Sequence, residues 1–134
     1  MNYNLSIIIV NYNNYWDTIQ IMEALALQQD ITFHLYIIDN NSPNESLVEL
    51  RKSISSNSSL IVNNKNVGYA QGVNQGLRLA LENRFQYSLV INNDIEFKSH
   101  TTIKNLMEVA DSNPNYAVLS PLILNNGVPV KIFY

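Results

Sequence analysis

Short apolar runs alternate with helix-period segments along most of the chain. The runs of strand length cover residues 5–10, 33–38, 59–62 and 87–91, and the first is almost wholly aliphatic and β-branched. Between them, apolar residues recur every three or four positions and predict helices over about 16–29, from 43 to about 54, from 69 to about 84, and around 103–110. Such alternation is typical of βαβ units. We therefore predict an α/β fold with a mostly parallel sheet flanked by helices.

Local signals predict where some of these elements begin and end. Ser42-Pro43-Asn44-Glu45 has the form of a capping box and predicts the start of the second helix. Residues 117–124 and 130–134 are predicted strands, and Asn126-Gly127 between them suits a hairpin turn. Because the last apolar run reaches the final residue instead of tapering into polar residues, we expect a fragment or a truncated gene product.

Small residues form one stripe along the third predicted helix. Gly68, Gly72, Gly76 and Ala80 are four positions apart and therefore lie on the same helical face. A bare face lets either the sheet or a ligand approach the backbone closely. We favour close packing against the sheet.

Composition narrows the class of protein. A chain of 134 residues with 46% hydrophobic residues can bury one core, so we predict a single domain over residues 1–134. A net charge of −3 disfavours a nucleic-acid partner. No apolar run approaches the roughly 20 residues of a membrane span, and the N-terminus lacks the pattern of a secretory signal. With no cysteine to form a disulfide framework, we expect a cytoplasmic protein.

Polar side chains follow each predicted strand. The four strand ends carry Asn11-Tyr12-Asn13, Asp39-Asn40-Asn41, Asn64-Lys65-Asn66 and Asn92-Asn93-Asp94. Open parallel sheets bind ligands beyond the carboxyl ends of their strands, and right-handed crossovers bring these ends to one edge. The sequence therefore predicts a ligand site built from loops that are far apart along the chain.

The chemistry of these loops points to a metal-assisted phosphate site. The chain has neither a G-x-G-x-x-G nor a P-loop motif, so a phosphate would need another cation. Asp94 suits Mg²⁺ or Mn²⁺, which prefer oxygen ligands, although a lone Asp after a strand more often caps a turn. Asp39 could accept hydrogen bonds from a base or ribose, or form an Asx turn. Tyr12 could stack on a flat ring or be a half-buried aromatic residue.

Both histidines are predicted to be structural. His34 lies within a predicted strand and His100 lies beside a predicted helix start. Neither has a second His or Cys at the spacing of a metal site.

Four segments, in this order, resemble family 2 glycosyltransferases of the GT-A fold, and rhamnosyltransferase-like members in particular. They are residues 6–13 (SIIIVNYN), 37–42 (IIDNNS), 63–70 (NNKNVGYA) and 90–94 (VINND). Each segment alone is a weak signal, but the ordered set extends over most of the chain. The resemblance implies that the chain is the N-terminal, nucleotide-sugar-binding portion of such an enzyme.

The resemblance also implies roles for individual residues. Val10, Asn11, Tyr12, Asp39 and Asn40 would contact the nucleotide base. Asn66 and Gly68 would line the donor pocket with Asn92 and Asn93, and Asp94 would hold Mg²⁺ or Mn²⁺ on the diphosphate. The family's D-x-D signature is altered, because Asn92 occupies a position where Asp is common.

By the same resemblance, the reaction is inverting transfer of a hexosyl or rhamnosyl group from a UDP- or dTDP-sugar to a glycan or lipid-linked acceptor, in polysaccharide or cell-surface glycan synthesis. The protein would act in the cytoplasm, either free or at the inner face of the membrane. The family's general base is an acidic residue downstream of the D-x-D region, and we expect it beyond Tyr134. Two alternatives are a non-catalytic nucleotide-binding fragment and a nucleotidyltransferase. The second would need a Gly-rich basic loop, which Asn11-Tyr12-Asn13-Asn14 is not.

Overall fold

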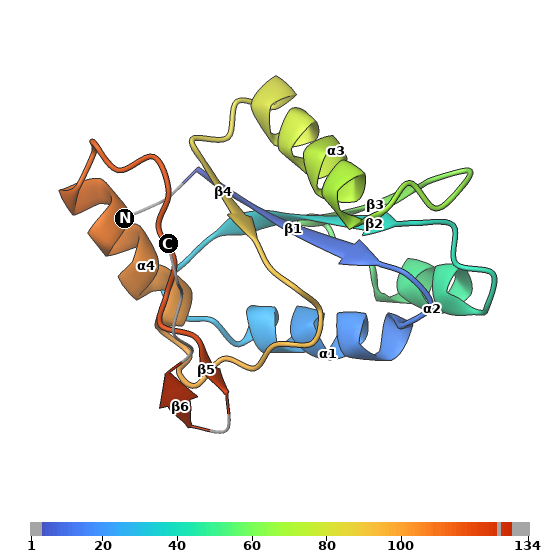
Figure 1. The fold of residues 1–134 in the computed structure, drawn as a ribbon, viewed down its shortest axis with the longest axis horizontal. Helices are drawn as coiled ribbons and strands as arrows, with labels where there is room; N and C mark the ends of the chain where they lie inside the picture. The colour runs from blue at the N-terminus through green and yellow to red at the C-terminus, as the bar shows by residue number, and fades with distance from the viewer. Residues whose placement is uncertain (1–3, 126, 130–134) are drawn as a thin grey trace.

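The centre of the protein is a sheet of four parallel strands (Figure 1). The computed structural model describes residues 4–125 and 127–129. The strands are β1 (Leu5–Asn11), β2 (Phe33–Asp39), β3 (Ser58–Val62) and β4 (Tyr87–Val90), in the spatial order β3-β2-β1-β4. Leu5 at the start of β1 is paired with Phe33 on one side and Tyr87 on the other. The predicted parallel sheet is confirmed.

Within the described residues, four helices flank the sheet, as the hydrophobic periodicity predicts. They are α1 (Tyr15–Ala26), α2 (Ser46–Ser53), α3 (Tyr69–Glu82) and α4 (Thr102–Ser112). Figure 1 shows α3 on one face of the sheet and α1 and α2 on the other, with α4 beyond β4. The α/β fold class is therefore confirmed.

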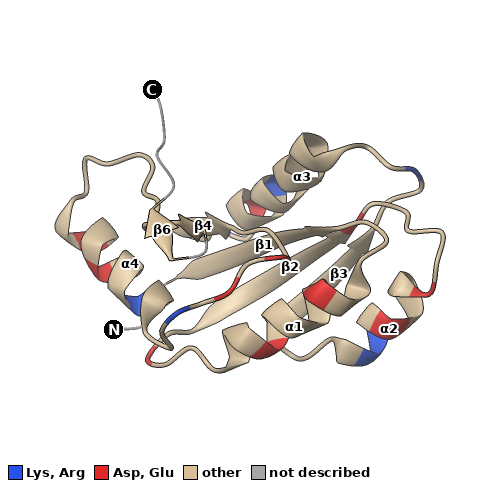
Figure 2. Cartoon of the chain, turned by 60° about the horizontal axis from the view of Figure 1, so that its bottom comes forward, with Lys and Arg blue, Asp and Glu red and all other residues tan. Residues whose placement is uncertain are grey.

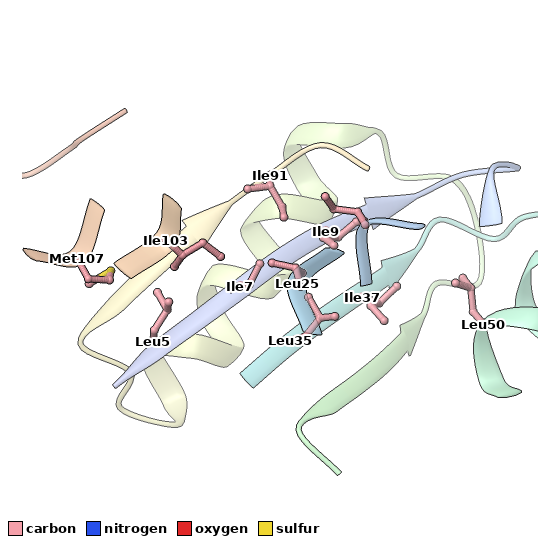
Figure 3. Packing of buried hydrophobic residues seen from close by; sticks show 11 residues of the cluster. Leu5, Ile7, Ile9, Leu25, Leu35, Ile37, Leu50, Ile91, Ile103 and Met107 are labelled. Atoms are coloured by element: carbon pink, nitrogen blue, oxygen red, sulfur yellow. The ribbon is translucent and has the colours of Figure 1, made fainter. Parts of the chain in front are cut away.

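Successive side chains of β1 point to opposite faces of the sheet, so the hydrophobic core has one part on each face. Leu5, Ile7 and Ile9 point to the face covered by α1, where they meet Ile21 and Leu25 (Figure 3). The intervening side chain of Ile8 points to the opposite face and joins Tyr36, Ile38 and Ala80 beneath α3. Because both faces of β1 are covered, its sequence is apolar at every position except Ser6 and Asn11.

The small residues of α3 allow it to lie close against β1. A Cβ atom added to Gly76 would be 2.5 Å from Ile8 Cγ2, and one added to Gly72 would be 3.1 Å from Val10 Cγ1. The expected close packing is confirmed at these two glycines. Gly68 differs, because it is exposed, has a φ of 83° and is the N-cap residue of α3.

Two predicted helix ends are wrong. Helix α2 begins at Ser46 with Glu45 as its N-cap, not at the Ser42 capping box. The physical reason is that the Ser42 hydroxyl and N–H donate to the Asp39 carboxylate at the end of β2. Ser42 is therefore bonded to the preceding strand and does not cap the helix. Helix α1 ends at Ala26 and not near Gln29.

The C-terminal part of the described chain departs most from the prediction. Residues 117–123 do not form a strand, and only β5 (Leu124–Asn125) pairs, antiparallel, with β6 (Val128–Pro129). No described strand runs beside 117–123, and apolar side chains there, such as Val118 at 86% exposure, reach solvent. The predicted strand 130–134 and Asn126 lie outside the described residues. In the part of the chain that the structure describes, no helix is long and apolar enough to cross a membrane.

Candidate functional site

The candidate site lies at the carboxyl ends of β1, β2 and β4. Strands β1, β2 and β3 follow one another in one direction across the sheet, and β4 then pairs with the other edge of β1. The strand order therefore reverses between β1 and β4, which is where open α/β sheets form a crevice for ligands.

Asn11 and Asp39 are the last residues of two neighbouring strands and form the buried floor of the site. They are paired in register and are 0% and 1% exposed. Asn11 Nδ2 donates to Asp39 Oδ1 at 2.7 Å. Ser42 donates its hydroxyl to the same oxygen at 2.7 Å and its N–H to Asp39 Oδ2 at 3.0 Å. Fixed donors thus hold the carboxylate, as a buried charge requires.

A second set of hydrogen bonds ties the start of α3 to the ends of β2 and β3. Asn40, 2% exposed, donates from Nδ2 to the Gly68 carbonyl at 3.2 Å and accepts from Asn63 Nδ2 at 2.8 Å. Asn63 and Gln75 exchange two further bonds of 2.9 Å. Asn66 Oδ1 accepts from the Gly68 N–H at 2.8 Å. It thereby satisfies a backbone donor at the N-terminus of α3 that has no hydrogen-bond partner within the helix.

In the loop after β4, two of the three residues Asn92, Asn93 and Asp94 are hydrogen-bonded to flanking helices. Asn92 Oδ1 accepts from the Tyr69 hydroxyl at 2.9 Å, and Asn93 Nδ2 donates to Thr18 Oγ1 at 2.9 Å. Burial raises the pKa of Tyr69, and the charge of Asp94 adds to this shift. The hydroxyl therefore stays protonated at neutral pH and can donate to Asn92.

Asp94 itself is exposed beside a shallow groove of about 380 Å³ between α1 and this loop. The groove is lined by Asp17, Gln20, Ala24 and residues 93–96. Magnesium is often held by one or two carboxylates together with substrate phosphates, and Asp94 offers one accessible carboxylate of this kind. Within residues 4–125 and 127–129, no group of three His, Asp or Glu side chains could hold a metal ion.

The structure brings together most of the residues that the sequence predicts for the site. Hydrogen bonds join Asn11 to Asp39 directly and to Asn93 through Thr18. The base-side residue Val10 is half-buried and its side chain packs under α3 at Gly72. The remaining predicted contact residues, Tyr12, Asn66, Gly68 and Asn92, are exposed along the same edge.

The polar residues of the site that were not predicted include Ser42, Asn63, Tyr69 and Thr18. Ser42, Asn63 and Tyr69 lie inside the segments that carry the family resemblance, but no role in the site was assigned to them. Thr18 could have been found from its position, because it is in phase with Ile21 and Leu25 on the buried face of α1. A hydroxyl on an apolar helical face signals a buried hydrogen bond. His34 has the structural surroundings expected, with its ring bonded to Ser59 Oγ and packed on Tyr36 and Phe85.

Comparisons with known proteins show what this chain is similar to in sequence and in fold. The family model described as Glycosyl transferase family 2 matches residues 6–133. The low-salt glycan biosynthesis hexosyltransferase Agl10 of Haloferax volcanii is 34% identical over 131 residues, which are 96% of this chain. The chain spans 39% of the length of that relative.

Solved structures share the fold at lower sequence identity. The mannosyltransferase PcManGT of Pyrobaculum calidifontis, solved in complex with GDP-Man and Mn²⁺, superposes with a TM-score of 0.70 at 14% identity and covers 82% of this chain and 33% of that one. Residues 1–349 of S. aureus TarS, solved with UDP, give a TM-score of 0.67 at 20% identity, with 82% and 32% covered. The predicted GT-A fold is confirmed by these neighbours.

Proposed function

Because this chain belongs to glycosyl transferase family 2, we propose that it forms the donor-binding part of an inverting glycosyltransferase. The donor would be a UDP- or dTDP-linked hexose or rhamnose, and the acceptor a glycan or a lipid-linked glycan. Because the chain spans 39% of its curated relative, the acceptor site and the general base are proposed to lie beyond Tyr134. Action in the cytoplasm or at the inner face of the membrane stays a prediction.

One observation carries this proposal: two carboxylates of different character lie at the ends of strands on either side of β1. Asp39 is buried and held by fixed donors, whereas Asp94 is exposed beside a groove. A buried, oriented carboxylate suits the N–H and O–H donors of a base or ribose. An exposed one suits a hydrated divalent cation.

The charge distribution supports a role for a metal ion. Lys and Arg residues are scattered over the helices and loops in Figure 2 and form no cluster at the strand ends, where the loop after β3 contributes Lys65. A diphosphate approaching this acidic domain needs a cation to offset its charge, and the sequence has no P-loop lysine. The neighbour solved with GDP-Man and Mn²⁺ supports a divalent ion of this kind.

Different residues of the chain would bind different parts of the sugar-nucleotide donor. Asp39, with Asn11 and Asn40, would orient the base, and Tyr12 would offer a ring face to it. Asn66, Gly68, Asn92 and Asn93 would contact the sugar-diphosphate part. A metal bound at Asp94 would stabilise the charge that develops on the leaving diphosphate.

Calorimetric titration of UDP, dTDP and GDP tests the proposal. Each is titrated into the wild-type chain and into Asp94→Ala, with Mn²⁺ or with chelator. We expect at least one nucleotide to bind more tightly with Mn²⁺. We expect Asp94→Ala to remove most of that gain, because the variant lacks the carboxylate that is proposed to hold the metal. Asp30→Ala removes an exposed carboxylate that pairs with Lys104 and is the matched control. A metal-dependent gain that survives Asp94→Ala would place the metal elsewhere.

A further inference from the structure

A buried chain of hydrogen bonds links the two sides of the site. Asn11 Nδ2 donates to Asp39 Oδ1 at 2.7 Å, Thr18 Oγ1 donates to Asn11 Oδ1 at 2.9 Å, and Asn93 Nδ2 donates to Thr18 Oγ1 at 2.9 Å. We call Asp39, Asn11, Thr18 and Asn93 the Thr18 relay. Its members come from β2, β1, α1 and the loop after β4, so it crosses the point where the strand order reverses.

The carboxylate at one end orients the Asn11 amide, and with it the acceptor that faces Thr18. A carboxylate only accepts, so Asn11 must turn its NH₂ group toward Asp39 and its carbonyl oxygen toward Thr18. Thr18 then donates its single proton to Asn11 Oδ1 at 2.9 Å, with the Asn14 carbonyl as a second acceptor at 3.1 Å. The lone pairs of Thr18 consequently face Asn93, which turns its own NH₂ group inward and leaves its carbonyl oxygen on the outer side.

This direction matters for the metal side of the site because Asn93 immediately precedes Asp94. Among the described residues, the other bond from Asn93 Nδ2 is a longer one of 3.4 Å to the Asn14 carbonyl. Thr18 is 0% exposed and lies in the first turn of a helix packed on the sheet, so it is a rigid anchor. The loop is thus held against α1 mainly through one hydroxyl group.

We propose that Thr18 is a positioning residue that holds the Asn92–Asp94 loop in the orientation in which Asp94 meets a metal-bound diphosphate. This inference rests on the proposed donor-binding function. Thr18 touches neither nucleotide nor metal and acts through Asn93. Its loss therefore weakens the metal-dependent part of nucleotide affinity and spares the metal-free part, because Asn11 stays bonded to Asp39 and Ser42.

The experiment compares Thr18→Val, which keeps the shape but removes the hydroxyl, with Thr18→Ser, which keeps the hydroxyl. Calorimetry on the full chain measures affinity for whichever of UDP, dTDP and GDP the wild type binds most tightly, with Mn²⁺ and with chelator. We expect Thr18→Val to lower the Mn²⁺-dependent gain by about tenfold, or ~1.4 kcal/mol. Thr18→Ser should restore most of it, and affinity in chelator should stay within about twofold.

Further variants separate positioning from general loosening of the fold. Asn93→Ala cuts the same bond from its other end, so its effect should not add to that of Thr18→Val in the double variant. Thr102→Val is the matched control, because the Thr102 hydroxyl donates to the local Ser99 carbonyl away from the site. Hydrogen exchange of residues 92–96 should accelerate in Thr18→Val but not in Thr102→Val. Circular dichroism confirms that each variant is folded.

The outcomes distinguish this inference from the function on which it rests. A wild-type chain without any metal-dependent gain would refute the proposed function, and the role of Thr18 with it. A wild-type gain that Thr18→Val leaves intact would refute the positioning role alone. Equal weakening with Mn²⁺ and with chelator, or full additivity with Asn93→Ala, would also overturn it, because either result indicates a structural role only.

Discussion

Replacement of Gly76 by Ala tests how closely α3 is packed against the central strand. The new Cβ would be 2.5 Å from Ile8 Cγ2 and 3.0 Å from Ile8 Cγ1. Ile8 is 0% exposed in the middle of β1, so it cannot turn away into solvent. The helix or the strand must move instead, and such overpacking costs roughly 1–3 kcal/mol.

Helix propensity acts in the opposite direction and sets the net magnitude. Ala favours a helix interior over Gly by ~1 kcal/mol. We therefore expect Gly76→Ala to lower the free energy of unfolding by about 1–2 kcal/mol, the clash exceeding the propensity gain. Gly72→Ala is the matched control on the same helix, because its nearest contacts, at 3.1 Å from Val10 Cγ1 and Cγ2, are less severe. It should remain within about 1 kcal/mol of wild type.

Urea denaturation followed by far-ultraviolet circular dichroism measures both changes. The double variant Ile8→Ala/Gly76→Ala adds a direct check, because removing the Ile8 side chain leaves space for the new methyl group. Its loss of stability should be smaller than the sum of the two single losses. A Gly76→Ala protein as stable as wild type, or strict additivity in the double variant, would refute the proposed steric contact.

Three further predictions concern pH, nucleotide binding and turnover. Burial lowers the pKa of His34 from its ordinary value of 6.5. Below that pH the unfolded chain binds this proton more readily than the folded chain does, so the free energy of unfolding falls as the pH drops. In urea titrations at pH 5 to 7, His34→Gln should flatten this fall, whereas replacement of the exposed His100 by Gln should not. Asp39→Ala should weaken nucleotide binding by about tenfold with and without metal, as calorimetry would show, because its proposed partner is the base or ribose and not the ion. Residues 1–134 should transfer little or no sugar in a donor-turnover assay even where they bind nucleotide; efficient transfer would refute the assignment of the base to a downstream residue.

The fold was predictable because burial on both faces makes most residues of β1 and β2 apolar, and burial of one face gives α1, α3 and α4 a helical period of apolar residues. Prediction failed where a run of apolar residues had no neighbour, as at 117–123, because a strand forms only when another strand accepts its hydrogen bonds. Sequence periodicity reports burial, and it does not report which strand is available for pairing.

The site was predictable to the same degree and for a similar reason. The rule that parallel strands end at one edge identified Asn11, Asp39 and the Asn92–Asp94 loop. It could not identify Thr18, which lies on a helix and not at a strand end, or the true role of Ser42, whose hydrogen-bond partner the sequence pattern does not show. Ser42 matched a helix cap in sequence, yet its hydroxyl and N–H are committed to Asp39.

The position of β4 beside β1 has a consequence for the way the protein reaches its native state. Leu5 pairs with Tyr87, so the second edge of the central strand is completed only when a segment far along the chain arrives. Contacts of such long sequence separation form slowly because the closure entropy must be overcome first. During synthesis at about 5–20 residues per second, we expect β1 to spend on the order of ten seconds as an unprotected, aliphatic edge strand. Docking of β4 thus completes the crevice and also covers the edge of β1 at which another chain could pair.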